Sequence, residues 1–181
     1  MSKCTDAAII ARAQNGGVDA VGELYDRHHR PVFRYIWART SNKQLAEDLT
    51  GEVFMRMLDY LPKYEVRGVP FRAWLYRIAG NLVKDHYRRA SQRTEVPLQQ
   101  AKEVEVRIYL DSGVEKMLTL EKVKEALQTI DPAQREVILL RFIAGLSLKE
   151  TAETLDKTVA AVKSLQHRGL VALRLALQLG G

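Results

Sequence analysis

The sequence predicts an all-α protein built of two small helical domains that are joined by a flexible linker, with a helix-turn-helix in the C-terminal domain. Apolar residues recur at helical spacing in almost every segment, and no segment shows the sustained alternation of a half-buried strand. Residues 91–112 are polar, contain a proline and lack a continuous apolar stripe, so we expect the linker there. The two domains are then expected at residues 1–90 and 113–181.

Capping and helix-breaking residues set the expected helices of the first domain. These helices cover residues 5–15, 19–39, 42–60 and 71–89, with a loop over residues 63–70. Thr5 is suited to cap the first helix, and Ser41 or Asn42 the third. Pro31 is expected to kink or split the second helix. The expected apolar stripe of the third helix consists of Leu45, Leu49, Phe54, Met57, Leu58 and Leu61.

The C-terminal domain ends in residues 147–174, whose spacing is that of a helix-turn-helix. Ser147 and Glu150 are placed to form a capping box, and Asp156 lies where the chain must turn. The small side chain of Ala152 allows the two helices to approach closely. Helices over residues 113–130 and 131–142 are expected before this motif. An ordinary helical hairpin with a solvated face is the alternative interpretation.

Composition and charge narrow the class of partner. The chain has 181 residues, a net charge of +6 and a pI of about 9.5, which suits an anionic partner such as a nucleic acid or a membrane surface. Its one cysteine, Cys4, cannot form an internal disulfide, and this favours a reducing compartment. Neither a secretory signal nor an apolar stretch of membrane-spanning length is present. We therefore expect a soluble, cytoplasmic protein.

A basic and amide-bearing stripe runs along the fourth expected helix, beside its apolar stripe. The members of this polar stripe are Arg77, Asn81, Lys84 and Arg88. Such a stripe suits a helix that lies on a nucleic-acid backbone, and a solvated face is the alternative. The loop before the helix carries Tyr64, Arg67 and Phe71, residue types that stack on or enclose an extruded base. Trp74 is better explained as a core residue.

Acidic and imidazole side chains give weaker signals. Asp48 and Glu52 share one face of the third expected helix, which indicates either a docking patch for a basic partner or an ordinary acidic cluster. His28 and His29 lack the partners and the spacing of a metal site. No nucleophile stands with a base and an orienting group at a workable spacing, so an enzyme is the weakest interpretation.

Three segments together resemble one family. They are AEDLTGEVFMRML at residues 46–58, FRAWLYRIAGNLVKDHYRR at residues 71–89, and the helix-turn-helix at residues 147–174. In this order and spacing they resemble an extracytoplasmic-function sigma factor of bacterial RNA polymerase, over residues 5–177. The resemblance implies region 2 in the first domain and region 4 in the second. It implies no catalysis, no cofactor, no metal and no small-molecule substrate.

The same resemblance implies contacts with core RNA polymerase, through the β′ clamp and the β flap, with promoter DNA and with an anti-sigma factor. The residues implied for docking on the polymerase clamp are Asp48, Leu49, Glu52 and Phe54. Those implied for the minus-10 element are Tyr64, Arg67, Phe71, Arg72, Arg77, Asn81, Lys84 and Arg88. Those implied for the minus-35 element are Lys157, Thr158, Ala160, Lys163, Ser164, His167 and Arg168.

Two departures from the family pattern bear on the promoter sequence. Asp156 stands at the turn where the family often has glycine, and Leu165-Gln166 stands where it often has Arg-Leu after the Lys-Ser pair. The alternative function is a free-standing helix-turn-helix regulator. Such a regulator should carry a sensing or phosphoacceptor domain with strands, and the N-terminal half shows no strand pattern.

Overall fold

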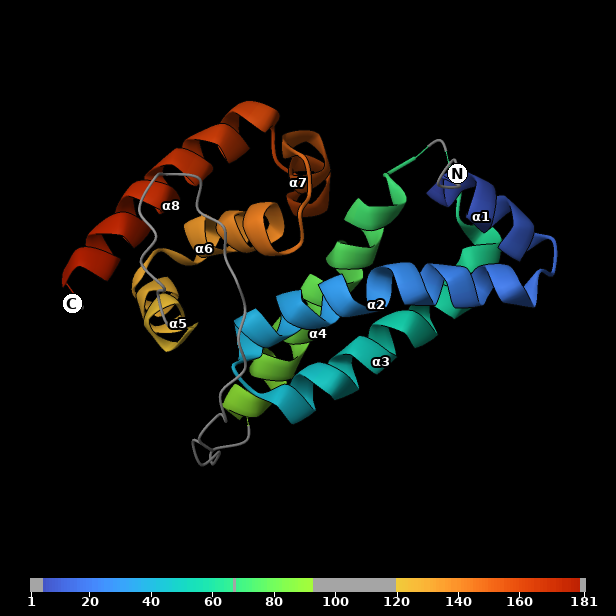
Figure 1. Ribbon diagram of the computed structural model, residues 1–181, viewed down its shortest axis with the longest axis horizontal. Coiled ribbons are helices and arrows are strands. Elements are labelled where there is room, and N and C mark those ends of the chain that lie inside the picture. Colours follow the sequence, from blue (N-terminus) through green and yellow to red (C-terminus); the bar gives the residue numbers. More distant parts are fainter. Residues whose placement is uncertain (1–4, 67, 93–119, 180–181) are drawn as a thin grey trace. The chain divides into compact units, whose positions relative to one another are not determined.

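The structure is a computed structural model that describes residues 5–66, 68–92 and 120–179, and within these ranges all regular structure is helical (Figure 1). The all-α prediction is confirmed. The chain divides between α4 and α5 into two compact units. The predicted linker lies outside the described residues except for its first two positions, which extend α4. The predicted domain boundaries therefore stay a prediction.

The described residues of the first unit form four α-helices and one short 3₁₀ helix. They are α1 (Asp6–Gln14), α2 (Val18–Thr40), α3 (Lys43–Tyr60), η1 (Leu61–Lys63) and α4 (Phe71–Gln92). The side chain of Thr5 caps α1, accepting from the amide of Ala8. The side chain of Asn42 caps α3, and Ser41 ends α2 in a left-handed conformation with φ 52°. Thr5 and Asn42 are caps that the sequence predicted, whereas Ser41, the alternative cap for α3, instead ends α2.

Of the two outcomes expected at Pro31, a kink or a split, the split is wrong, because α2 continues through the proline. Proline in a helix interior removes one backbone hydrogen bond and strains the preceding turn. Val32, Tyr35 and Ile36, which follow it, are all fully buried. Core packing after the proline therefore outweighs the local cost, and the helix is preserved.

The expected stripe of α3 is right except at its edge. Leu49, Phe54, Met57 and Leu61 are buried, but Leu58 is 41% exposed. At about 100° per residue, Leu58 lies about 40° beyond Phe54, outside the buried arc. Val53 and Thr50, which the expected stripe left out, lie within that arc and are buried.

The second unit is formed by α5 (Leu120–Thr129), α6 (Pro132–Ile138), the π-helical turn η2 (Leu139–Ile143), α7 (Leu148–Leu155) and α8 (Val159–Leu179). Asp131 caps α6 through the amides of Ala133 and Gln134, with Pro132 in first position, as predicted. The expected helix over residues 131–142 widens into η2, where the amide of Ala144 donates to the carbonyl of Leu139 at 3.0 Å. The first residues of the expected helix 113–130 lie outside the described part.

Candidate nucleic-acid and partner interfaces

Local hydrogen bonds build the helix-turn-helix in the second unit. The Ser147 hydroxyl accepts from the amide of Glu150 at 3.1 Å, and the Glu150 carboxylate accepts from the amide of Ser147 at 2.7 Å. This is the predicted capping box. Asp156 takes the left-handed conformation, with φ 53° and ψ 50°, and the amide of Lys157 then reaches the carbonyl of Ala152 at 2.9 Å. The hydroxyl of Thr158 caps α8 by accepting from the amide of Ala161 at 3.1 Å.

Apolar packing fixes the angle between α7 and α8. Ala152 of α7 and Val162 of α8 are buried against Val137 of α6, and three partly buried leucines pack around them. Those leucines are Leu148, Leu155 and Leu165. The inner faces of both helices are therefore used in packing, as the sequence predicted, and the opposite face of α8 is left to solvent.

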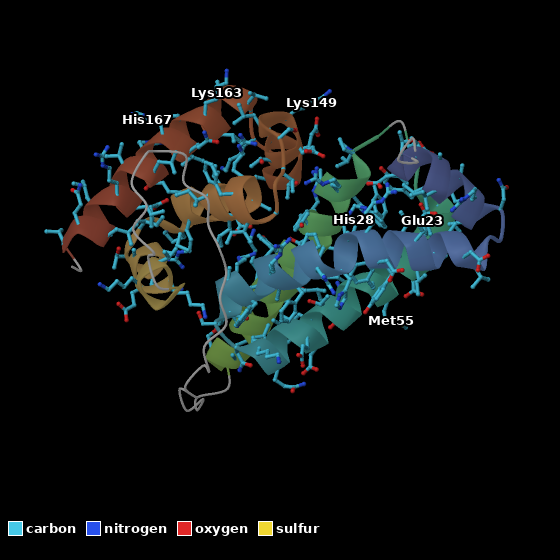
Figure 2. The ribbon with its side chains drawn as sticks, viewed as in Figure 1. Glu23, His28, Met55, Lys149, Lys163 and His167 are labelled. Carbon is cyan, nitrogen blue, oxygen red and sulfur yellow. The ribbon has the colours of Figure 1, made fainter. Side chains whose placement is uncertain are left out.

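The outer face of α8 and the turn before it carry all seven residues that the resemblance assigned to the minus-35 element. All seven are exposed: Lys157, Thr158, Ala160, Lys163, Ser164, His167 and Arg168. Lys163 and His167 project outward from α8 (Figure 2). The Nε of Arg168 donates to the carbonyl of Ser164 at 3.4 Å, so this side chain lies back along the helix. No acidic residue follows Asp156 in the sequence, so this face is cationic.

Lys149 is a candidate that the sequence analysis missed. It is exposed on α7, the first helix of the motif, near that helix's N-terminus (Figure 2). In helix-turn-helix proteins the first helix crosses the nucleic-acid backbone, where a lysine suits a phosphate. Its position one residue after Leu148, which packs inward, is the signal that would have identified it.

The polar stripe of α4 in the first unit is solvent-accessible at its C-terminal end. Asn81, Lys84 and Arg88 are exposed, and Arg72 and Arg77 are half-buried. Arg88 pairs with Asp85, with Nη2 of the arginine 3.1 Å from Oδ1 of the aspartate, and the pair is exposed. Exposed pairs of this kind contribute little to stability, so Arg88 remains available to a phosphate. Arg67, assigned to the same element, lies outside the described residues.

The loop before α4 is supported by an aromatic cluster. The ring of Tyr64 lies 5.1 Å from that of Trp74 and 5.7 Å from that of Phe71. The Tyr64 hydroxyl donates to the carbonyl of Val69 at 2.7 Å, and burial raises the pKa of Tyr64, which keeps the donor protonated. Phe71 is only 5% exposed and packs on His28. Phe71 therefore supports the loop from the core, while Tyr64, at the start of the loop, is half-buried and partly accessible to solvent.

The acidic patch of α3 is exposed, but the apolar residues assigned with it are buried. Asp48 accepts from Gln44 at 3.2 Å, and Glu52 pairs with Arg56 at 2.7 Å, both across one helical turn. Leu49 is 7% exposed and Phe54 is 4% exposed. Leu49 and Phe54 pack into the core and hold the helix that carries the acids. Any part that these two side chains have in docking is therefore indirect.

Met55 adds an apolar side chain at the edge of this acidic patch. It is 61% exposed and lies on the outer side of α3 (Figure 2). At about 100° per residue it falls about 20° from Asp48 and about 60° from Glu52 around the helix axis. Methionine is enriched at protein–protein interfaces, so we group this exposed side chain with the two acids. We call Asp48, Glu52 and Met55 the α3 patch.

Two further observations concern other kinds of site. Within the described ranges, no three histidine, cysteine or acidic side chains come together as a metal site would require. None of the helices in the described part of the chain combines the length and the apolar character needed to cross a membrane.

Comparison with known proteins decides the family. Residues 24–93 match the family Sigma-70 region 2, and residues 126–175 match Sigma-70, region 4. The ECF RNA polymerase sigma factor SigD of Mycobacterium tuberculosis is 34% identical over 175 residues, covering 92% of this chain and 81% of SigD. The chain is an ECF sigma factor.

Two further relatives agree. The ECF RNA polymerase sigma factor BldN of Streptomyces coelicolor is 41% identical over 168 residues, covering 91% of this chain, and the match spans 63% of the length of BldN. The solved structure of CnrH in complex with the cytosolic domain of CnrY superposes with a TM-score of 0.75 at 26% identity, covering 97% of this sigma factor and 99% of CnrH.

Membership in the family disfavours the free-standing regulator. The N-terminal half of this sigma factor is region 2. It is therefore not the sensing domain that a free-standing regulator would carry before its helix-turn-helix. Sigma factors are regulatory subunits of RNA polymerase and not catalysts. The α4 stripe and its loop belong to region 2, and the outer face of α8 belongs to region 4.

Proposed function

We propose that this sigma factor binds core RNA polymerase and directs it to promoters by reading a minus-10 element with region 2 and a minus-35 element with region 4. The observation that carries this proposal is the outer face of α8. Seven polar, basic or small residues are exposed on this face and in the turn before it. The position of α8 is fixed by a capping box, a left-handed turn and a cluster of buried apolar residues. A rigid helix with such a face suits the major groove.

On the minus-35 element, the early part of α8 supplies the base contacts. Lys163 donates to purine acceptors, and Ser164 and His167 form further hydrogen bonds. Ala160 is small and lets the helix approach the bases. Arg168 lies back along the helix toward Ser164 and is better placed for a phosphate.

On the minus-10 element, region 2 holds melted DNA. The exposed Asn81, Lys84 and Arg88 follow one side of α4 and suit the backbone of a single strand. The loop over residues 64–70 lies at the start of this stripe, with Tyr64 at its base to stack on or enclose an extruded base. The sigma factor thereby assists melting, because it binds single-stranded DNA and an extruded base, which the closed duplex does not present.

Docking on core polymerase uses the α3 patch. Two acids beside an exposed methionine suit a basic and apolar partner surface, such as a coiled coil of the β′ clamp, and a second contact joins region 4 to the β flap. Because polymerase and promoter DNA are cytoplasmic, we place the protein in the cytoplasm.

An anti-sigma factor is the further partner that we propose. CnrH, which shares the fold over nearly its whole length, is solved in complex with the cytosolic domain of CnrY. This sigma factor has two separate basic surfaces, on α4 and on α8, and a regulator that covered either would stop promoter binding. Pull-down from cells in inducing and non-inducing conditions should recover this regulator; recovery of polymerase alone in both conditions would argue against it.

Charge reversal tests the docking surface. The double variant Asp48→Lys, Glu52→Lys should lose binding to core polymerase by at least about 100-fold, because repulsion replaces two attractive contacts. The variant Asp19→Lys, Glu125→Lys changes the net charge equally at exposed acids elsewhere and should bind as wild type does. If the first variant binds core polymerase normally in a pull-down titration, the α3 patch is only a solvated face.

A further inference from the structure

Gln14, the last residue of α1, forms two hydrogen bonds to a distant part of region 2. Its Nε2 donates to the carbonyl oxygen of Leu61 at 2.9 Å and to the carbonyl oxygen of Tyr64 at 2.7 Å. These carbonyls lie at the two ends of η1, immediately before the minus-10 loop. Gln14 itself is exposed, so it does not contribute to the core. Helix α1 also precedes residues 24–93, the segment that matches region 2.

The hydrogen bond from Gln14 to Tyr64 acts on the residue at which the loop begins. The backbone of Tyr64 is held by Gln14, while its hydroxyl crosses the loop to the carbonyl of Val69 at 2.7 Å. Its ring rests on Trp74 and Phe71 at the start of α4. Tyr64 therefore joins the start of the loop to its end, and Gln14 fixes the point from which it does so.

The other end of α1 is fixed independently, so α1 is a rigid support. Oδ1 of Asp6 accepts from Arg27 at 2.8 Å, and Oδ2 lies 3.1 Å from Nε2 of His28, a buried residue of α2 (Figure 2). Arg12 also pairs with Glu23 of α2 at 2.5 Å. The apolar face of α1 is anchored by two isoleucines, Ile9 and Ile10, which are almost fully buried.

Because α1 is anchored to α2 through Asp6 and Arg12, the side-chain amide of Gln14 is held at a defined place beside the loop. A loop that is ordered before it meets DNA loses less conformational entropy on binding, and the geometry of its contacts is better defined. We infer that Gln14 is a positioning residue for the minus-10 loop, and that α1 thereby acts as part of the promoter-reading surface without touching DNA. This inference rests on the proposed function of the loop.

Two substitutions of Gln14 separate its hydrogen bonds from its size. Gln14→Met keeps the length of the side chain and removes the donor, and Gln14→Glu places a carboxylate against two carbonyl oxygens. Asn15→Ala is the matched control, because the Asn15 side chain donates only within α1, to the carbonyl of Ala11. Each full-length variant is combined with core polymerase on a promoter from which the wild type initiates. The readouts are core binding, open-complex formation, and open-complex formation on templates with single-base changes in the minus-10 element.

Core binding should be unchanged in all three variants. Open-complex formation should fall about 5- to 10-fold in Gln14→Met, as expected for two neutral hydrogen bonds at an exposed site, and further in Gln14→Glu. The preference for the cognate minus-10 element over its single-base variants should narrow in both, whereas Asn15→Ala should match the wild type.

Two outcomes would overturn the inference. If Gln14→Met forms open complexes as the wild type does and keeps its base preference, the hydrogen bonds do not position the loop. If it instead loses core binding together with open complexes, Gln14 acts on the stability of the whole unit. A wild-type chain that binds core polymerase but initiates nowhere would overturn the proposed function itself, and that result is distinct from both.

Discussion

The Nε of Arg141, on the π-helical turn, donates to Oε1 of Gln166 on α8 at 2.8 Å. The Nη1 of the same arginine donates to the carbonyl oxygen of Leu146, just before the helix-turn-helix begins. One half-buried guanidinium thus joins the turn that leads into α7 to α8. Gln166 lies between Ser164 and His167 in the sequence, so this contact helps to hold the part of α8 that we propose reads the minus-35 element.

Removing the charged donor should loosen this arrangement. We expect Arg141→Met to destabilise the C-terminal unit by about 1–3 kcal/mol, because hydrogen bonds from a charged group are lost and a carbonyl is left unpaired. Arg174→Met, which changes an exposed arginine of α8, should change stability by less than about 0.5 kcal/mol. Urea unfolding followed by far-UV circular dichroism measures both, and equal stability of the two variants would show that the Arg141 contacts are unimportant.

Gly169 allows α8 to pack closely on α6. A Cβ at this position would lie 2.8 Å from Cδ1 of Ile138 and 3.2 Å from Cβ of Gln134, and Ile138 is buried. We therefore expect Gly169→Ala to destabilise the C-terminal unit by about 1 kcal/mol, since overpacking outweighs the gain in helix propensity.

Gly22 of α2 is the matched control for that substitution, because nothing lies within 4 Å of a Cβ built there. Gly22→Ala should stabilise its own unit by about 0.5–1 kcal/mol. Thermal unfolding of the two variants should thus give shifts of opposite sign. A stabilised Gly169→Ala variant would mean that Ile138 moves aside without cost.

The base-reading and phosphate-contacting roles on α8 should behave differently on mutation. Lys163→Ala should cost about 1–3 kcal/mol on the cognate minus-35 element and relax the preference at one or two base pairs. Arg168→Ala should weaken binding to all sequences alike and reduce the slope of log affinity against log salt concentration by about one. Binding to a panel of single-base minus-35 variants at several salt concentrations checks both. If Lys163→Ala leaves the base preference intact, Lys163 is a phosphate contact.

Asp6 should give the first unit a dependence on acid pH. Burial raises the pKa of Asp6, but the hydrogen bonds and charges of His28 and Arg27 outweigh it and leave the pKa below its usual 3.8. A carboxyl with a lowered folded-state pKa contributes stability above its unfolded-state pKa, and this contribution is lost as pH falls through the folded-state value.

The variant Asp6→Asn should therefore be less stable than the wild type at pH 6, by about 1 kcal/mol or less. The difference should shrink once the pH falls below 3.8. Melting temperatures of both proteins across this range measure it, with Asp19→Asn, an exposed acid of α2, as the control. A difference that stayed constant down to the lowest pH would show that the charge of Asp6 is not what stabilises α1.

Local signals predicted most of the fold. The capping box of Ser147 and Glu150, the turn at Asp156 and the caps Thr5 and Asn42 depend on residues within one helical turn, so the sequence alone contains the information. The exposure of the outer face of α8 follows from helical spacing once the inner face is known. The assignment of seven residues there and in the preceding turn to the minus-35 element came from the family resemblance and stays a prediction.

Features that depend on tertiary packing were missed. The continuity of α2 at Pro31 and the exposure of Leu58 depend on where the core lies around each helix. The hydrogen bond from Arg141, on the π-helical turn, reaches Gln166, a residue 25 positions later in the chain. The contact of Gln14 with Tyr64 joins residues 50 positions apart, and no periodicity or motif points to it.

Run-off transcription tests the central claim most directly. The full-length chain is mixed with core polymerase and fragments of the genomic DNA of its source, and the start points of the transcripts are mapped. We predict that the chain and core together give transcripts from discrete start sites that share minus-10 and minus-35 elements, and that neither does so alone. If core polymerase that is active with another sigma factor gives no discrete start with this chain, the claim that it directs promoter-specific initiation is contradicted.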